Sequence, residues 1–345
     1  MKRAAFTLST LLLLAACSTP RPVTDDRAVP ESNGNVRFSV IGDMPYLPHE
    51  HPMLTAPDGA IVKAVRAYDP PVLIHLGDLK SGDSACTDSL LVARRDQIFD
   101  LNPYRAVYTP GDNDWTDCDR EEMSPQFDEL ERLSFIRSIF YQSDEGAKLT
   151  RDIPGLTRQS GFVENAMWTI NGLVFGTLHI PGTNNGRDEF FPPSDVDKAL
   201  DEADRRDAFN EAWVDSLFDA AASAPALVIT FQADIYYPDL DKSHKECTTQ
   251  NRQDCDGFKR IRDYMERKAV LYQKPVLLVH GDTNAYCFHK PVGLAINLWR
   301  LNAPGDFKLS DAAQVAFDPD DTETPFEVQA MLTKTPLPKI CDYSR

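Results

Sequence analysis

The stretch Tyr108–Trp115 reads Tyr-Thr-Pro-Gly-Asp-Asn-Asp-Trp, so an apolar run stops at a glycine and polar side chains that can bind metals follow at once. The same arrangement occurs three more times, where a short β-branched run ends in Gly42–Asp43, Gly77–Asp78 or Gly281–Asp282. Such runs are typical of buried parallel strands, and open α/β sheets place their ligand sites beyond the carboxyl ends of those strands. The four motifs therefore predict strands that deliver carboxylates to one edge of a sheet.

Composition limits what this edge can bind. The chain has 345 residues, 42% of them hydrophobic, which allows a sizeable core, and its formal net charge is −17 at pH 7. A surface of this charge repels polyphosphate backbones, so we expect no binding of nucleic acid. The simplest role of the charge is to keep the protein soluble.

The N-terminus has the pattern of an export signal. Lys2 and Arg3 precede the apolar stretch 4–16, which is too short to span a bilayer and ends at Cys17 in the sequence Leu-Ala-Ala-Cys. This ending resembles a bacterial lipobox, so we expect a lipoprotein signal peptide over 1–17, lipid modification of Cys17, and a flexible tether over 18–35. Ser18 after the cysteine favours an outer-membrane anchor facing the periplasm. The alternative is an ordinary cleaved leader with an incidental cysteine.

Six cysteines remain, an even number that favours disulfides in an exported chain. Cys247 and Cys255 bracket a polar loop and can close it locally, whereas Cys86 and Cys118 each follow a Gly-Asp motif and should lie near the same rim. Cys287 then pairs with Cys341 by elimination. Free buried thiols are the alternative for some of the six.

A coarse reading of the chain alternates strands and helices, which is typical of parallel β-α-β units. Asn171–Gly172, between the runs 166–170 and 173–180, is a strong hairpin signal and predicts the start of a second, antiparallel sheet. We expect a helix to begin at Ser124, and no clear element after Asp318 beyond 326–332. The other expected strands are 36–42, 72–77, 104–109, 226–231 and 276–280, and the other expected helices are 59–68, 86–100, 195–223 and 257–272.

Several carboxylates on one rim can share divalent cations, because each strand fixes its own ligand. Two such cations can hold the attacking and departing oxygens of a phosphoryl transfer. The motifs therefore predict hydrolysis of phosphoesters.

The order of the motifs resembles that of the calcineurin-like metallophosphoesterases, over about residues 36–292. The resemblance implies an α/β fold with four layers, α/β/β/α, built on a double sheet and forming a single domain over 36–345. It also implies a hydrolase that acts on a small phosphoester at a dinuclear metal site, and the lipobox at Cys17 adds the expectation that this hydrolase is anchored in the envelope.

The resemblance also implies a ligand set, one residue for each family motif. Asp43 matches the first aspartate of the family and Asp78 the bridging one, while Pro45 stands at the first histidine position. Asp112 stands where the family has asparagine, and Asn113 where it has the histidine that assists the transition state. The implied metal ligands are Asp43, Asp78, Asp112, Gln232, Asp282 and Asn284.

In this ligand set, oxygen donors replace nearly every histidine of the family. Gln232 lies where a histidine ligand is expected, with Asp234 as a competitor, and Asp282 and Asn284 replace both histidines of the last motif. Oxygen donors suit Mg²⁺, Mn²⁺ or Ca²⁺ better than zinc. We expect one well-formed metal position and a second, thinner one.

The remaining candidates come from the neighbouring residues. His280, beside the last motif, is a candidate general acid or else a buried histidine at a strand end; His179 is open to the same two interpretations. Asn185 is either part of a plain turn or a phosphate contact, and Tyr46 and Trp115 are expected to line the cleft.

Two functions of other classes remain open. The domain can be a catalytically inactive scaffold that binds a partner, or a calcium-binding envelope protein without turnover. The replaced histidines favour these alternatives. The retained aspartates favour catalysis, because converging buried carboxylates without a cation are costly.

Overall fold

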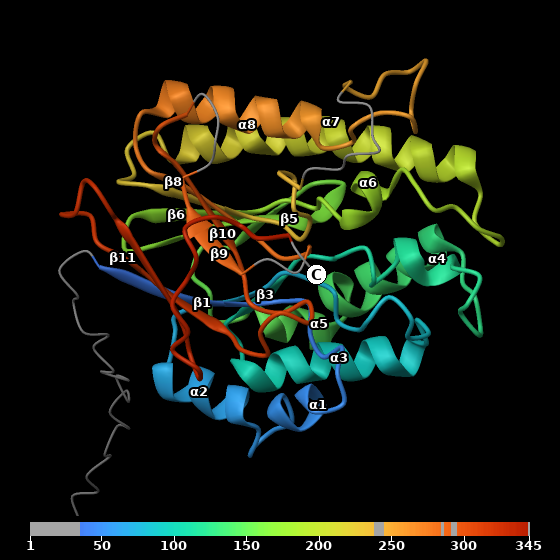
Figure 1. Ribbon diagram of the computed structural model, residues 1–345, viewed down its shortest axis with the longest axis horizontal. Coiled ribbons are helices and arrows are strands. Elements are labelled where there is room, and N and C mark those ends of the chain that lie inside the picture. The colour runs from blue at the N-terminus through green and yellow to red at the C-terminus, as the bar shows by residue number, and fades with distance from the viewer. Residues whose placement is uncertain (1–34, 238–244, 284–285, 291–294, 344–345) are drawn as a thin grey trace, which may run out of the picture. The chain divides into compact units, whose positions relative to one another are not determined.

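The computed structural model describes residues 35–237, 245–283, 286–290 and 295–343, which belong to one compact unit spanning 34–345 (Figure 1). Its strands are β1 (Val36–Ile41), β2 (Leu73–His75), β3 (Ala106–Tyr108), β4 (Thr157–Gln159), β5 (Phe162–Ile170), β6 (Leu173–Thr177), β7 (Leu227–Thr230), β8 (Val276–His280), β9 (Cys287–His289), β10 (Leu298–Asn302), β11 (Ala313–Phe317) and β12 (Phe326–Ala330). Its helices are α1 (Glu50–Met53), α2 (Ala60–Tyr68), α3 (Asp88–Leu101), η1 (Thr116–Asp119), α4 (Glu129–Arg137), η2 (Ser138–Gln142), α5 (Asp144–Leu149), α6 (Gly182–Gly186), α7 (Val196–Ala220) and α8 (Lys259–Tyr272).

The described strands form two sheets. The first has the order β12-β11-β1-β2-β3, in which β1, β2 and β3 are parallel. The second has the order β4-β5-β6-β7-β8-β10-β9, in which β6, β7, β8 and β10 are parallel. In both sheets the parallel strands are nearly fully buried, in keeping with their predominantly apolar sequences.

Three apolar cores separate four layers. The middle core joins the inner faces of the two sheets, and includes Phe38 of β1 and Phe175 of β6, whose ring centroids lie 5.1 Å apart. A second core packs the first sheet against α2, α3 and α4, and a third packs the other sheet against α7 and α8. Figure 1 shows α7 and α8 on one outer side and α2 and α3 on the other. The expected α/β/β/α double-sheet architecture is confirmed.

The predicted hairpin is also confirmed. β5 and β6 pair antiparallel, with Ile170 opposite Leu173. Asn171 and Gly172 between them both have positive φ, 47° and 85°, which a two-residue hairpin turn of this kind requires. The next strand of this sheet, β7, runs parallel to β6, so the hairpin starts a mixed sheet.

One expectation about the sheets was wrong. The four Gly-Asp motifs do not share one sheet, because β1, β2 and β3 lie in the first sheet and β8 lies in the second. A buried parallel strand has the same local pattern in either sheet, so the motifs alone do not distinguish between the two.

Two element boundaries also differ from expectation. The helix predicted to begin at Ser124 begins at Glu129, because the carboxylate of Asp128 accepts a hydrogen bond from Glu131 N at 2.8 Å and caps it there. Near the C-terminus, the unpredicted strand β11 inserts between β1 and β12, and the unpredicted β10 pairs with β8. Of this region, only 326–332 was recognised.

All three expected disulfides are confirmed. Cys86–Cys118 joins the segment after β2 to η1, and Cys247–Cys255 closes a local loop. Cys287–Cys341 ties β9 to the C-terminal tail. These bonds leave none of the six as a free thiol, whereas Cys17 lies outside the described residues.

Candidate functional site

The aspartates of the Gly-Asp motifs meet where the two sheets end side by side. Asp282 N donates a hydrogen bond to Asp43 Oδ1 at 3.2 Å, which links the end of β8 to the end of β1. Asp306, after β10, joins them, because its backbone N donates to Asp43 O at 3.1 Å. We use "carboxylate cluster" for Asp43, Asp78, Asp112, Asp282 and Asp306.

The backbone explains why aspartate recurs after glycine at these strand ends. Asp43, Asp78, Asp282 and Asp306 have φ values of 52°, 56°, 66° and 45°. This left-handed conformation is uncommon outside glycine, and aspartate is one of the residues that tolerate it best. Each strand therefore turns sharply and leaves a carboxylate at its end.

Three of the glycines provide space for a carboxylate from another segment. A β-carbon added at Gly281 would lie 2.0 Å from Asp43 Oδ2, and one at Gly111 would lie 1.9 Å from Asp78 Oδ1. A β-carbon at Gly182 would lie 2.2 Å from Asp112 Oδ2. Each of these three carboxylates therefore packs against a glycine from a different segment of the chain.

Asp78 lies at the centre of a hydrogen-bonded group. Its Oδ2 accepts from the Tyr46 hydroxyl at 2.6 Å and from Asn113 Nδ2 at 2.8 Å, and its Oδ1 accepts from Asn113 N at 3.2 Å. Asn113 Nδ2 also donates to the Tyr46 oxygen at 2.9 Å. The structure thus places two predicted site residues, Tyr46 and Asn113, directly on the predicted bridging aspartate.

Asp112 has partners from the second sheet. Gln232, just after β7, donates from Nε2 to Asp112 Oδ1 at 3.0 Å, while its Oε1 accepts from Gly182 N at 2.6 Å. Thr183 Oγ1 lies 2.9 Å from Asp112 Oδ2 and 2.8 Å from Asp117 Oδ1. Gln232 is therefore beside the cluster, as expected, and Thr183 is a neighbour that the sequence did not reveal.

The environment of the cluster disfavours the ionised form of its carboxylates. Burial raises the pKa of Asp43, Asp78 and Asp282 well above the ordinary value of an aspartate, and the charges of neighbouring aspartates raise it further. Burial, with the charge of Asp112, also raises the pKa of Asp117 to about 7. Like charges packed this closely favour either a bound proton or a bound cation.

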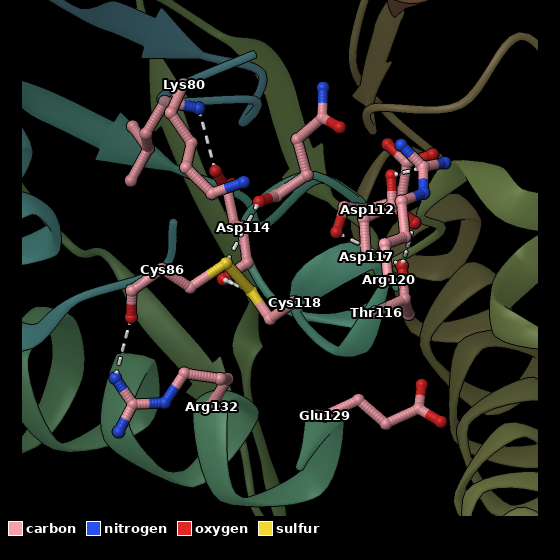
Figure 2. The surroundings of a disulfide bond; sticks show 12 residues. Lys80, Cys86, Asp112, Asp114, Thr116, Asp117, Cys118, Arg120, Glu129 and Arg132 are labelled. Atoms are coloured by element: carbon pink, nitrogen blue, oxygen red, sulfur yellow. Dashed lines mark hydrogen bonds and ion pairs between the residues drawn. A yellow bond between two sulfur atoms is a disulfide. The ribbon is translucent and has the colours of Figure 1, made fainter. Parts of the chain in front are cut away.

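The second acidic residue of the opening motif, Asp114, has a structural role. Asp114 accepts hydrogen bonds from Asp78 N, Leu79 N and Gly111 N at 3.0, 2.7 and 2.9 Å, and from the Tyr108 hydroxyl at 2.9 Å. Figure 2 shows it beside the Cys86–Cys118 disulfide and the buried side chain of Lys80. Asp114 thereby fixes the turns that carry Asp78 and Asp112.

The residues present fit a hard cation, although their side chains do not converge fully. Asp43 is 1% exposed, and its Oδ2 has no hydrogen-bond partner among the described residues. No three carboxylates in the described part of the chain bring oxygens within 4.8 Å of one another. Oxygens of Asp78 and Asp112 already accept hydrogen bonds from neighbouring side chains, and a bound cation would have to replace some of these donors.

His280 is not at the cluster. It is fully buried and stacked on Phe231, with ring centroids 5.9 Å apart. Its Nε2 accepts from Arg300 Nε at 2.8 Å and its Nδ1 lies 2.7 Å from Gly281 O, so both ring nitrogens are engaged. Burial lowers its pKa to about 4. This geometry agrees with the structural alternative for His280 and leaves no nitrogen for a substrate.

His179 and Trp115 are likewise buried rather than exposed to a cleft. Their ring centroids lie 5.5 Å apart, edge to face, and Arg206 lies over Trp115 at 5.3 Å. His179 Nδ1 is 3.4 Å from Glu164 Oε1, which is too long for a well-formed hydrogen bond. Burial lowers the pKa of His179 despite Glu164. The structure thus places both residues in the interior.

Asn185 is also internal. Its Nδ2 donates to Asp207 Oδ1 at 2.7 Å and to Gly257 O at 3.2 Å, so it ties α6 to α7 and to the segment before α8. Residues 183–185 have φ near +50°, as in the turn alternative. Asn284, the last predicted ligand, lies outside the described residues.

Asp306 and its neighbour Phe307 were not anticipated from the sequence. A signal for them exists, because Pro304–Asp306 repeats the Pro-Gly-Asp of residues 110–112 after the apolar strand β10. The strand contains Arg300, which interrupts the apolar run and hides the pattern.

A second group of potential ligands lies elsewhere. Among the histidine, cysteine and acidic side chains of the described residues, those of Cys287, His289 and Cys341 bring three potential ligand atoms within 4.8 Å of one another. The two cysteines form a disulfide, so their sulfurs are not the thiolates that bind metals. We therefore assign this group a structural role.

A search of the described helices finds none that combines the length and apolarity needed to cross a membrane. No model of a known protein family matches the chain, and no curated protein matches it. Among solved structures, a similar one is that of the NAD nucleotidase NadN of Haemophilus influenzae, with 11% identity and a TM-score of 0.37. The match covers 86% of this chain and 49% of that chain, so this chain spans about half the length of the nucleotidase.

Proposed function

We propose that the chain is a metal-dependent phosphoester hydrolase whose active site is the carboxylate cluster. The observation that carries the proposal is the buried Asp43 Oδ2, which lacks a hydrogen-bond partner among the described residues and lies in the field of Asp112, Asp282 and Asp306. A buried, unpaired carboxylate oxygen of this kind costs several kcal/mol unless a proton or a cation neutralises it. Converging aspartates at strand ends are a common way to hold one.

In this proposal, Asp43, Asp78, Asp112 and Asp282 hold Mg²⁺, Mn²⁺ or Ca²⁺, with Asn284 as a further oxygen donor. Gln232 positions Asp112 through the hydrogen bond from its Nε2. Oxygen donors of this type favour hard cations. A bound divalent cation polarises the phosphoryl oxygens and lowers the pKa of a water molecule.

The residues around Asp78 supply the remaining functions. Asn113 Nδ2 donates to Asp78 Oδ2 and to the Tyr46 oxygen, and it would exchange one of these hydrogen bonds for one to a phosphoryl oxygen, in place of an imidazole. Burial and the charge of Asp78 raise the pKa of Tyr46 well above its ordinary value, so its hydroxyl remains protonated. The hydroxyl donates to Asp78 Oδ2 in the structure, and it would turn from that oxygen to donate to the leaving-group oxygen.

A second candidate is divalent-cation binding without turnover. The observation that favours it is the burial of His179 and His280, which removes the two imidazoles expected to serve as general acids. This candidate shares the metal site with the first and differs only in the absence of hydrolysis.

The test combines metal binding with hydrolysis. The chain is stripped with a chelator and titrated with Mn²⁺, Mg²⁺ and Ca²⁺ by calorimetry, and hydrolysis of aryl phosphomonoesters and diesters is then measured. Asp78→Asn and Asp112→Asn should each weaken metal binding at least about tenfold and abolish hydrolysis. Asp58→Asn, at a side chain that is 87% exposed, is the matched control and should leave both unchanged.

Each outcome of this test discriminates. Metal binding together with hydrolysis supports the enzyme, and metal binding without hydrolysis supports the second candidate. If no divalent cation binds, or if the Asp78 and Asp112 variants behave as the wild type, both are wrong.

We also propose that the protein is lipid-anchored in the bacterial envelope through Cys17. The support is the charged and apolar leader that ends in Leu-Ala-Ala-Cys. Cys17→Ser should lose incorporation of a labelled fatty acid and leave the membrane fraction. Unchanged membrane association of the variant would refute the anchor.

A further inference from the structure

An exposed aromatic ring lies next to the carboxylate cluster. Phe307 is 56% exposed, and directly follows Asp306 at the end of β10. Both residues have left-handed backbones, with φ values of 61° for Phe307 and 45° for Asp306. A bulky residue in this conformation is strained, and such strain tends to occur where a side chain is held for a function.

The loop that carries this ring is fixed against β1. Asp306 N donates to Asp43 O at 3.1 Å, and Lys308 N donates to Gly305 O at 3.0 Å. A β-carbon added at Gly305 would lie 2.4 Å from Gly42 O, so the loop is in direct backbone contact with the strand end that carries Asp43. The backbone that carries Phe307 is therefore fixed beside the end of β1, whereas the ring itself is exposed.

The ring is connected to the cluster through Tyr46. The ring centroids of Phe307 and Tyr46 lie 5.0 Å apart, at an interplanar angle of 52°. At its other end, Tyr46 donates its hydroxyl hydrogen to Asp78 Oδ2 at 2.6 Å. The two rings thus form a wall that extends from the carboxylates, where a phosphoryl group would bind, to the solvent.

We propose that the group esterified to the phosphate is a planar aromatic one, and that it stacks on Phe307 while the phosphoryl group binds at the cluster. This inference rests on the proposed function. Aromatic faces attract other rings through dispersion and their quadrupoles, and stacking of a base on an aromatic side chain is tolerant of the base's identity. Aryl phosphates and nucleoside phosphates share this chemistry. A phosphoester of a non-aromatic alcohol has no ring to place on Phe307.

The test compares three phosphomonoesters, namely phenyl phosphate, adenosine 5′-monophosphate and glycerol phosphate. Phe307→Ala should raise KM for the two aromatic substrates about tenfold, leave kcat nearly unchanged, and leave KM for glycerol phosphate within about twofold. Phe307→Trp should restore the low KM, whereas Phe307→Leu, which is apolar but not planar, should not. Ile340→Ala, at a side chain that is 78% exposed, is the matched surface control.

The outcomes separate the inference from the function. If Phe307→Ala changes KM equally for all three substrates, or changes none of the three KM values, the proposed stacking is wrong. A selective effect on adenosine 5′-monophosphate identifies a nucleoside substrate, and an equal effect on both aromatic compounds identifies the aromatic group as such. Absence of hydrolysis refutes the hydrolase, and stacking is then judged by calorimetry. Binding of phenyl phosphate that exceeds binding of glycerol phosphate and is lost in Phe307→Ala supports it, and any other result overturns it.

Discussion

Gly281 and Asp43 follow strands of different sheets, β8 and β1, yet the Asp43 carboxylate occupies the space that a side chain at Gly281 would need. Gly281→Ala should therefore displace the carboxylate without changing its charge. We expect the affinity for Mn²⁺ to fall by about tenfold to a hundredfold, as for other changes that misplace a metal ligand. Calorimetric titration measures the effect, and denaturant unfolding checks that the fold persists. If the folded variant binds Mn²⁺ with wild-type affinity, the close packing of Asp43 against Gly281 is not required for metal binding.

Glu129, at the start of α4, carries a second prediction. Burial, with the charge of Asp119, raises its pKa to about 9, so the folded protein retains this proton between about pH 4.5 and 9, where the unfolded chain has lost it. The free energy of unfolding should therefore fall as pH rises through this window, by up to about 1.4 kcal/mol per pH unit.

Glu129→Gln should remove this part of the pH dependence, because the amide does not titrate. Denaturant unfolding at pH 5, 7 and 9 measures the slope, and Glu121→Gln, at an exposed position, is the control. An unchanged slope in Glu129→Gln would contradict the raised pKa.

Individual site residues were predictable where the backbone dictates the residue type. Asp43, Asp78 and Asp282 follow glycine at strand ends whose left-handed turns favour aspartate, so the motif itself reports the geometry. The histidines were not predictable in the same way. Whether His280 faces a cleft or the interior depends on Arg300, which lies on a strand that the sequence did not reveal.

At the scale of the element, β6 connects the two sheets through its aromatic residue. The Phe175 ring lies 5.1 Å from that of Phe38 and is stacked at 5.3 Å on that of Trp168. Phe175→Ala should lower the free energy of unfolding by about 3–5 kcal/mol, because it leaves a cavity between the sheets. Phe307→Ala, the same substitution at an exposed site, should cost less than about 1 kcal/mol. Similar losses in both variants, measured by denaturant unfolding, would contradict this assignment of the core.

The elements that were predicted are those with strong local signals. Helix α7 and the β5–β6 hairpin have such signals in amphipathic periodicity and in Asn171–Gly172. Strand β11 was missed because its short alternating sequence is defined by its partners on either side, β1 and β12. The assignment of parallel strands to one sheet or the other depends on the same long-range pairing.

For the whole molecule, the charge of −17 and the carboxylate cluster predict two separable responses to salt. Sodium chloride at about 0.15 M shortens the Debye length to about 8 Å and should raise stability modestly by screening. Mn²⁺ at matched ionic strength should add about 2.7 kcal/mol at a concentration one hundred times its dissociation constant. Only this addition should disappear in Asp78→Asn. Equal effects of the two salts on the unfolding midpoint would contradict a specific site.

The positions of the carboxylates in the sequence also determine when the cluster forms during folding. Asp43 and Asp282 are separated by 239 residues, and they meet only when the first sheet docks on the second. Contacts between such distant segments require closure of a long loop and usually form late. A cation bound at this junction would therefore stabilise the native state far more than the folding transition state. Its kinetic effect would be to slow unfolding and prolong the lifetime of the folded protein, with little change in the rate of folding.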